Sequence, residues 1–457
     1  MVTLASLTDG PAERTMPPSM SKPLGVNYWR LWIASVISNL GDGISGVAYP
    51  WLASAITRNP VHIALVGVAT RLPWLVFSLP AGVITDRVDR RRLVVAMDAF
   101  RAIVTIGVAI VVLAYQSELS SPELIASGEA VAPAGAGMLL AVLYISAVLF
   151  GLAEVLRDNA AQTLMPSVVS KDNLEKANGR LWGAEMVTNS FIGPPLGGFL
   201  LAVAFSVPFF VDAGTFAVSA AMVALLAGSF RPQVKDSSAP RPSFLADLKE
   251  GFRWLWNHRL LRTLAIVLGL LNAAGSATTA TIVLFAQEVL NLDATGFGLL
   301  ASAGAVGGIL GSFGASAVSK ALGTGPSLAA TFVIGIGTSI VIGLTSSATL
   351  VWAMFAIGTF SAIVWNVITV SLRQAIIPDH LLGRVNSVYR FFGWGMMPIG
   401  IFIGGLMVQV VTGLADRDLG LRAPFFAAAV VDLLLMIYAV PRLTTAKIEA
   451  ARAGTAD

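Results

Sequence analysis

The chain has 457 residues, of which 56% are hydrophobic and 12% are charged, and its net charge is +4. A soluble protein carries roughly 25% charged residues, so this composition excludes a soluble globular fold and indicates an integral membrane protein. The sequence contains no cysteine and only three scattered histidines, which excludes disulfides, thiol catalysis and cysteine-ligated metal. We therefore expect no metal and no cofactor, and without a phosphate loop or a nucleophile constellation we expect no enzyme.

The first 28 residues are polar and contain prolines, with no apolar core of a signal peptide, so we expect a disordered cytoplasmic tail. Twelve apolar stretches follow, each close to the roughly 20 residues that a membrane span needs. Because lipid leaves no backbone group unpaired, we expect every stretch to be a helix. The predicted spans are residues 29–55, 61–84, 93–115, 138–163, 180–204, 208–229, 262–287, 296–318, 327–346, 349–376, 386–411 and 422–441.

The basic residues predict the orientation of these spans. Most of the 30 Lys and Arg residues fall in the two tails and in the even-numbered connections, whereas the other side holds only Arg58, Arg417 and Arg422. Basic loops stay in the cytoplasm, so we expect both termini there and the chain in the inner membrane. The basic residues gather on no soluble face, so no nucleic-acid partner is expected.

The connection between the second and third predicted spans holds a charged motif. It consists of Gly82, Asp86, Arg87, Arg90 and Arg91. An arginine cluster alone would only anchor the topology. With Gly82 and Asp86 four residues apart ahead of the arginines, the motif resembles the loop between helices 2 and 3 of major facilitator superfamily transporters.

That resemblance implies a gating role for the motif. In the family, the loop acid and arginines latch the outward-open state against helix 11 and an acid on helix 4. Asp86, Arg87 and Arg91 match those positions, and Asp158 matches the partner acid. The family usually has glycine where this chain has Asp89, a residue that tolerates a left-handed turn.

An internal repeat supports the same family. Residues 162–166 and 374–378 share a Gln-x-x-x-Pro pattern, each ahead of an asparagine that opens the next span. A duplicated six-helix unit places the substrate path between two pseudo-symmetric halves. The expected organisation is a tail at 1–28, a bundle at 29–229, a cytoplasmic linker at 230–261, a second bundle at 262–441 and a tail at 442–457. The linker contains helical apolar spacing from residue 244 to 256, which predicts an amphipathic helix rather than a plain linker.

The fifth predicted span contains Gly193, Pro194, Gly197 and Gly198, which resemble the family's antiporter motif. Physically, Gly193 and Gly197 permit a close helix contact, and the prolines favour a kink. Ordinary packing of small residues is the alternative, because the eighth span has similar glycine spacing without the motif.

Charged residues within spans are functional hypotheses by default, because burying them in lipid is costly. Asp42 and Arg71 lie near the middles of neighbouring spans and could pair, while Asp98 and Arg101 lie one helical turn apart. Static ion pairs are the alternative for both. The fourth span carries a cluster of Glu154, Arg157 and Asp158, and Asp212 is expected at a solvated helix end. The candidate proton carriers are Asp42, Glu154 and Asp432.

The family resemblance extends along residues 29–441 and points to bacterial exporters of drugs and siderophores. We therefore expect export of a small amphipathic organic compound in exchange for protons, by a monomer surrounded by membrane lipid. A siderophore or other metabolite as cargo, an uncoupled facilitator and a sensor that retains the fold are the alternatives. Helices that line the cavity in the family carry the predicted substrate-binding residues Asn39, Trp51, Asn272, Trp365, Asn366 and Trp394.

Overall fold

The computed structural model describes residues 24–453, without residues 86, 121–123, 125–130, 229 and 231–243. The described residues form helices and connecting turns, and no strand occurs among them. Twelve helical segments of this described chain are long and apolar enough to cross a membrane. The predicted all-α membrane fold with twelve spans is therefore confirmed.

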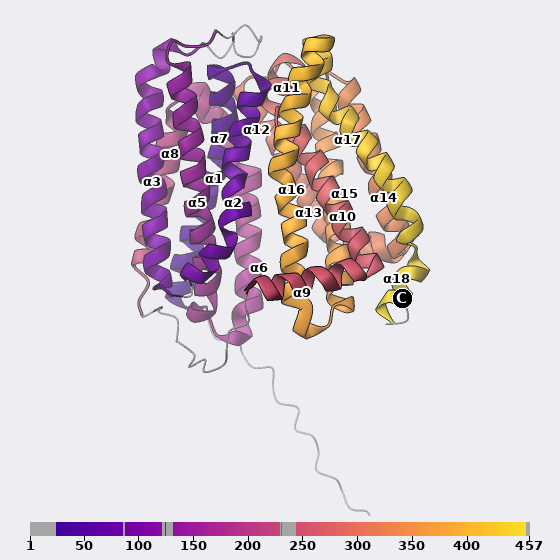
Figure 1. Cartoon of the computed structure of the whole chain (residues 1–457). Helices are drawn as coiled ribbons and strands as arrows, with labels where there is room; N and C mark the ends of the chain where they lie inside the picture. Colours follow the sequence, from indigo (N-terminus) through magenta and orange to yellow (C-terminus); the bar gives the residue numbers. More distant parts are fainter. Residues whose placement is uncertain are drawn as a thin grey trace, which may run out of the picture.

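The first six spans form one bundle, seen in violet and purple in Figure 1. The fifth span is continuous in space but changes its winding, because Pro194 and Pro195 donate no backbone hydrogen bond and a π-helical turn precedes them. The elements are α1 (Gly25–Ile56), α2 (Pro60–Thr85), α3 (Arg90–Tyr115), α5 (Ala136–Val168), the fifth span of α6 (Leu174–Glu185), η3 (Met186–Ile192) and α7 (Gly193–Val203), and α8 (Val207–Ala224).

The last six spans form the second bundle, in red to yellow in Figure 1. Its first two spans are interrupted near residues 280 and 302. The elements are α10 (Arg259–Thr279) with α11 (Ile282–Glu288), α12 (Ala294–Ala301) with α13 (Ala303–Leu322), α14 (Thr324–Leu344), α15 (Ala348–Ile376), α16 (Asp379–Leu414) and α17 (Arg417–Ala439). The span in α16 begins several residues before the predicted residue 386, directly after Pro378.

The expected amphipathic helix is present as α9 (Phe244–Asn257), which crosses beneath the second bundle in Figure 1. Gly251 lies against the backbone of α16, and Glu250 accepts a 2.6 Å hydrogen bond from Arg384 of α16. A short helix, α18 (Thr445–Arg452), lies at the same end of the molecule. We call this end the α9 end and the opposite one the α11 end.

Small residues let the two bundles approach closely. On α16, Gly405 lies against Pro60 and Ala64 of α2, and α2 and α16 pack together. On the other side of the molecule, α7 packs on α12 and η3 packs on α13. Within the described chain, α6 is not packed closely on the second bundle, so the fifth span meets it through its portion nearer the α11 end.

Charged side chains join the two bundles at the α11 end. Glu288, the last residue of α11, forms ion pairs with Arg58 at the end of α1 and with Arg417 of α17, the latter at 2.8 Å. Next to it, Gln287 donates a 2.8 Å hydrogen bond to Ser54 of α1 and accepts one from Arg58. This group, which we call the α11-end clamp, holds the halves together at one end of the molecule.

Candidate functional site

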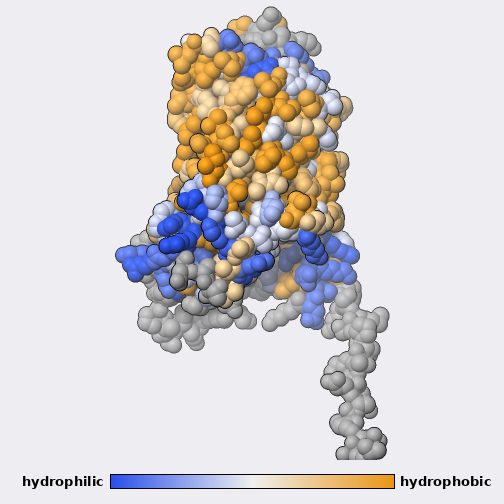
Figure 2. All heavy atoms as spheres, turned by 90° about the vertical axis from the view of Figure 1, so that its right-hand side faces the viewer, coloured by the Kyte–Doolittle hydropathy of each residue, from blue (hydrophilic) through white to orange (hydrophobic). Residues whose placement is uncertain are grey.

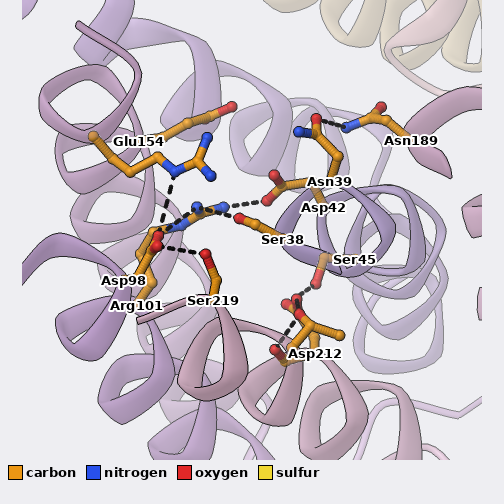
Figure 3. A network of polar contacts seen from close by, with 12 residues as sticks. Ser38, Asn39, Asp42, Ser45, Asp98, Arg101, Glu154, Asn189, Asp212 and Ser219 are labelled. Atoms are coloured by element: carbon orange, nitrogen blue, oxygen red, sulfur yellow. Dashed lines mark hydrogen bonds and ion pairs between the residues drawn. The ribbon is translucent and has the colours of Figure 1, made fainter. Parts of the chain in front are cut away.

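A network of charged side chains lies inside the first bundle, at the middle of its spans. Arg101 of α3 is fully buried and pairs with Asp42 of α1 and with Asp98 one helical turn away, at 3.6 Å. Its guanidinium also lies 3.8 Å from the ring centre of Phe216, a cation–π contact. Figure 3 shows Asp42 of α1, Asp98 and Arg101 of α3 and Ser219 of α8 converging.

A second arginine extends the network into α5. Arg157 lies 3.4 Å from Asp98 and 3.2 Å from Asp158. Asp98 in turn accepts a 2.7 Å hydrogen bond from Ser219 of α8. Two nitrogens of Arg157 and Nε of Arg101 have no hydrogen-bond acceptor among the described residues, so the arginines retain capacity for a further partner.

The pairing of Asp42 differs from the sequence-based prediction. Asp42 pairs with Arg101 rather than with Arg71, because α1 lies against α8 and α5, which place it next to the side chains from α3. The prediction for Asp212 was also wrong. Asp212 is fully buried rather than solvated, and it accepts a hydrogen bond from Ser45 of α1, which draws it toward the network (Figure 3).

One edge of the network reaches the side of the bundle that faces the second half. Glu154 of α5 accepts a 3.4 Å hydrogen bond from Trp74 of α2 and interacts electrostatically with Arg71. Trp74 lies against Trp394 of α16, with ring centres 5.6 Å apart. Arg71 itself is exposed in the middle of α2. The boundary between the halves therefore combines a carboxyl, a guanidinium and two indole rings.

The predicted substrate-binding residues are distributed unevenly. Asn39 accepts a 3.4 Å hydrogen bond from Asn189 of η3, and Asn272 of α10 donates one of 2.8 Å to Gly393 of α16. Trp394 is 42% exposed and Asn366 is exposed on α15.

Three predicted residues lie apart from the group of Arg71, Trp74, Glu154 and Trp394. Trp51 is fully buried against Phe297, and Trp365 is 3% exposed against Phe332, because both rings fill gaps between packed helices. These two tryptophans therefore line no open wall in this structure. Asp432 of α17 is 8% exposed and faces Gly335 of α14, so it is separate from the charge network.

The charged motif begins at Gly82 near the end of α2 and continues into α3. Its acid, Asp86, lies outside the described residues. Arg90 donates to the carbonyl of Thr163 at 3.0 Å, and Arg91 donates to that of Leu226 at 2.6 Å, both within the first half. Arg87 is exposed, and a Cβ atom at Gly82 would meet nothing within 4 Å.

Asp89 plays a different part from the one expected. Its φ is −66°, so there is no left-handed turn at this position. The carboxylate instead accepts a 3.0 Å hydrogen bond from the backbone of Arg92 and caps the start of α3. The replacement of glycine by aspartate is thus accommodated by helix capping.

The glycines of the fifth span form two contact faces. A Cβ atom at Gly193 would lie 2.7 Å from Gly43, and one at Gly197 would lie 2.7 Å from the carbonyl of Ile44, so this face touches α1. Gly198 instead contacts the backbone of α12, and Gly298 of α12 approaches Pro194. The close helix approach expected at Gly193 and Gly197 is present, and the same segment carries a contact between the halves.

Sequence reasoning missed two groups of residues. The α11-end clamp escaped it because Gln287 and Glu288 end one span, whereas the half-buried Arg58 and Arg417 lie at the ends of two other spans. The neutral partners of the charge network, which include Ser38, Phe150 and Phe216, also gave no signal beyond being polar or aromatic within a span. Only the spacing of Asp212 and Ser219, seven residues apart on one face of α8, could have linked these two residues to the network.

Comparison with known proteins identifies the family. The family model described as "Transmembrane secretion effector", of the major facilitator superfamily, matches residues 19–453. The multidrug efflux pump Tap of Mycolicibacterium fortuitum is 29% identical over 423 residues, which cover 90% of this chain and 94% of Tap. The enterobactin exporter EntS of Citrobacter koseri is 26% identical over 417 residues, covering 89% of this chain and 90% of EntS.

Solved structures share the fold at low sequence identity. A bacterial homologue of the lysosomal transporter Spinster aligns with a TM-score of 0.69 at 14% identity, over 94% of this chain and 98% of its own. The nucleoside transporter NupG aligns with a TM-score of 0.63 at 10% identity, over 91% and 98% of the two chains. The chain is therefore a multi-pass membrane transporter of small molecules, not an enzyme, and belongs to the transmembrane secretion effector family of the major facilitator superfamily.

Proposed function

We propose that this transporter exports small amphipathic organic compounds from the cytoplasm in exchange for protons, by alternating access. The names of its relatives, a multidrug efflux pump and an enterobactin exporter, support export of organic compounds. The charge network of the first half is the observation that supports proton coupling. The exchange follows if proton and substrate compete for one site between the halves.

The network contains more acids than bases. Asp42, Asp98, Glu154, Asp158 and Asp212 face only two buried guanidinium groups, those of Arg101 and Arg157. Burying unpaired carboxylates is costly, so an excess of acids favours proton uptake by one or more of them. Because the acids interact with one another, a change at one of them alters the affinity of the others for a proton.

Within this network, Asp42 and Glu154 are the proposed proton carriers. The side chain of Asp42 is 16% exposed and that of Arg101 1%, so Asp42 is the member of this ion pair that water reaches. Glu154 lies at the boundary between the halves beside Trp74. Asp432 lacks any ion pair or hydrogen bond within the described chain and is kept as a third, separate candidate.

The substrate is proposed to bind between the halves, on the side of the network where Glu154 lies. Trp74 and Trp394 would contact its apolar part, and Asn39, Asn272 and Asn366 would supply hydrogen bonds. A cationic compound would be drawn to Glu154, whose deprotonation would then be coupled to substrate binding.

Alternating access is proposed to act through two sets of contacts. The α11-end clamp and the α7–α12 contact would hold the α11 end closed, and they must separate before cargo leaves on that side. The motif of Gly82, Asp86, Arg87, Arg90 and Arg91, with Asp158, is proposed to latch the α9 end in the alternative state. Proton and substrate would bias the equilibrium by binding the two states unequally.

The α9 end is proposed to face the cytoplasm, with both chain termini on that side of the inner membrane. It carries the arginines of the charged motif as well as the basic residues of α9 and α18, whereas the α11 end carries Arg58, Arg417 and Arg422. Retention of basic segments in the cytoplasm supports this orientation. The proposed transporter works as a monomer, since each chain contains both halves of the path.

The test is uptake of ethidium into inverted vesicles that carry the protein, driven by an inward-acidic proton gradient. We expect the wild type to accumulate ethidium and Asp42→Asn to lose the gradient-driven part of the uptake. Asp89→Asn is the matched control, because Asp89 lies outside the network and asparagine retains an oxygen that can cap α3. This control should retain gradient-driven uptake. Ethidium uptake by the wild type that does not depend on the proton gradient would refute proton coupling and favour an uncoupled facilitator.

A siderophore as cargo is the second candidate function, favoured by the similarity to the enterobactin exporter. A catecholate siderophore is acidic, so Arg71, exposed at the boundary between the halves, would be its partner instead of Glu154. Transport of ethidium and of a catechol compound should then be measured separately in Arg71→Gln. Loss of catechol transport with ethidium transport retained would favour this alternative.

A further inference from the structure

A cavity of about 610 Å³ lies at the α9 end of the second half, away from the boundary between the halves. Its walls come from the end of α9, the start of α10, the end of α17 and α18. No part of the proposed transport path contributes to it.

The side chains that line this cavity are strongly basic. Arg259, Arg262, Arg442 and Lys447 all contribute to its walls, and no Asp or Glu does. In the part of the chain that the structure describes, none of these four cations forms an ion pair. Four positive charges around one cavity repel each other unless an anion lies between them.

The hydrogen bonds of these cations leave most of their donors available. Arg442 and Lys447 donate to the carbonyls of Tyr438 and Pro441 at 2.5 and 2.7 Å, and Arg262 donates to that of Trp256 at 3.1 Å. Such bonds cap the end of a helix, but each uses only one of the N–H groups of an arginine or lysine. The side chain of Arg259 makes no hydrogen bond within the described chain and is exposed.

The cavity lies at the level where the spans end. The span of α10 begins at Arg259, and the last span ends at Arg442, so the cations lie at headgroup depth. Val430 and Leu434, which are 55% and 60% exposed, precede Tyr438 at intervals of four residues and form an apolar stripe along α17. Figure 2 shows an apolar band on this side of the molecule, with hydrophilic residues beyond both of its ends, one of which is the α9 end.

We propose that this cavity binds the phosphate headgroup of an anionic phospholipid, whose acyl chains lie along the apolar stripe of α17. Guanidinium groups bind phosphate oxygens in a bidentate manner, and Tyr438 can lie at the boundary between headgroup and chain. Basic pockets at the ends of spans suit such headgroups. A free phosphate shares this charge chemistry but cannot use the stripe.

Occupation of the cavity would link four elements of the second half. The headgroup would neutralise Arg259 and Arg262 at the start of α10 together with Arg442 and Lys447 around α18. Since α9 ends at the same place, the lipid would also fix the linker helix to the second bundle. Removal of anionic lipid should therefore loosen α9 and α18 while leaving the charge network of the first half intact.

The test uses the full-length protein, purified in detergent and freed of lipid, with the midpoint of thermal unfolding as readout. Phosphatidylglycerol, phosphatidylcholine and inorganic phosphate are titrated separately to obtain an apparent Kd for each. We expect stabilisation by phosphatidylglycerol only. A basic residue near a membrane contributes about fivefold in affinity, so Arg442→Gln should weaken binding about fivefold and Arg442→Gln with Lys447→Gln about thirtyfold.

The control removes two charges from α9 outside the cavity, in Lys249→Gln with Arg253→Gln, both exposed. This variant should bind phosphatidylglycerol as the wild type does. Equal weakening in the control would overturn the site in favour of general attraction to an anionic surface, and equal stabilisation by inorganic phosphate would overturn the lipid in favour of a free anion. If the double variant fails to fold, Arg259→Gln, which breaks no side-chain hydrogen bond, must itself weaken binding about fivefold.

Discussion

The contact between α7 and α12 at Gly198 provides a direct test of how the halves separate. A Cβ atom at Gly198 would lie 3.1 Å from the carbonyl carbon of Ala294 and 3.1 Å from Cα of Thr295. Both neighbours are backbone atoms of the second half, so no side chain can rotate away. In Gly198→Ala the halves must therefore move apart at this contact.

The size of the effect follows from the cost of overpacking. An extra methyl group in a packed contact costs about 1–3 kcal/mol. This cost falls only on the state in which α7 and α12 touch. The population open at the α11 end should therefore rise about 5- to 150-fold relative to the closed state.

The assay measures the reactivity of a single cysteine at Ser54, a fully buried residue of the α11-end clamp. The natural chain has no cysteine, so there is no background labelling. A membrane-impermeant maleimide should modify Ser54→Cys slowly in the parent and at a rate increased by the factor above in Gly198→Ala.

Two controls separate gating from misfolding. Gly183→Ala lies in the same span, but its Cβ would meet nothing within 4 Å, so the rate should not change. A cysteine at Ser146, buried inside the first half, should stay equally unreactive in both backgrounds. If Gly198→Ala leaves the rate at Ser54→Cys unchanged, the idea that this glycine sets the distance between the halves is refuted.

Three further predictions concern other charged residues. Arg101→Gln leaves Asp42 and Asp98 without their shared cation and should lower the stability in detergent by about 3–5 kcal/mol, with partial recovery when Asp42→Asn is added; an unchanged unfolding midpoint would contradict the network. Glu288→Gln removes the partly exposed ion pairs of the α11-end clamp and should speed the labelling of Ser54→Cys about fivefold, corresponding to about 1 kcal/mol. Labelling at the parent rate would contradict the idea that these ion pairs keep the α11 end closed. Burial lowers the pKa of His258, so the contribution of its neutral form to stability is present above pH 6.5 and is lost as the pH falls through its folded pKa. His258→Asn can still cap α10 and should lose less stability than the wild type between pH 7 and pH 5. Identical pH profiles of the two proteins would contradict a role of His258 in this loss.

The fold could be predicted because membrane spans are governed by a local property. Twelve apolar runs of sufficient length predict twelve helices whatever their neighbours are. Helix ends were less well predicted, as in α16, where polar residues from Asp379 onward continue the helix beyond its apolar part. The family motif indicated the superfamily, because its residues lie close together in one short connection.

Pairing within the bundle could not be predicted in the same way. Asp42 and Arg71 both lie near the middle of their spans, but depth in the membrane says nothing about which side of a helix faces which neighbour. Arg101 is the partner of Asp42 because α5 and α8 both pack on α1 and on α3 and so bring the two side chains together. The burial of Asp212 likewise depends on Ser45, a residue 167 positions away.

The burial of the tryptophans illustrates the same limit. Trp51 and Trp365 carry an indole that suits a substrate wall and suits a packed core equally well. Only the arrangement of α12 against α1 and of α14 against α15 decides between the two roles. Trp394, by contrast, remains exposed beside Trp74, where the two halves face each other.

Competition between proton and substrate is tested most directly by proton release from the purified protein. Ethidium is added to the wild type in weakly buffered detergent solution, and the pH change is recorded together with ethidium binding by fluorescence. We predict that the wild type releases protons as ethidium binds, and that Asp42→Asn releases fewer for the same amount bound. Saturable binding of ethidium by the wild type with no proton release would contradict the account.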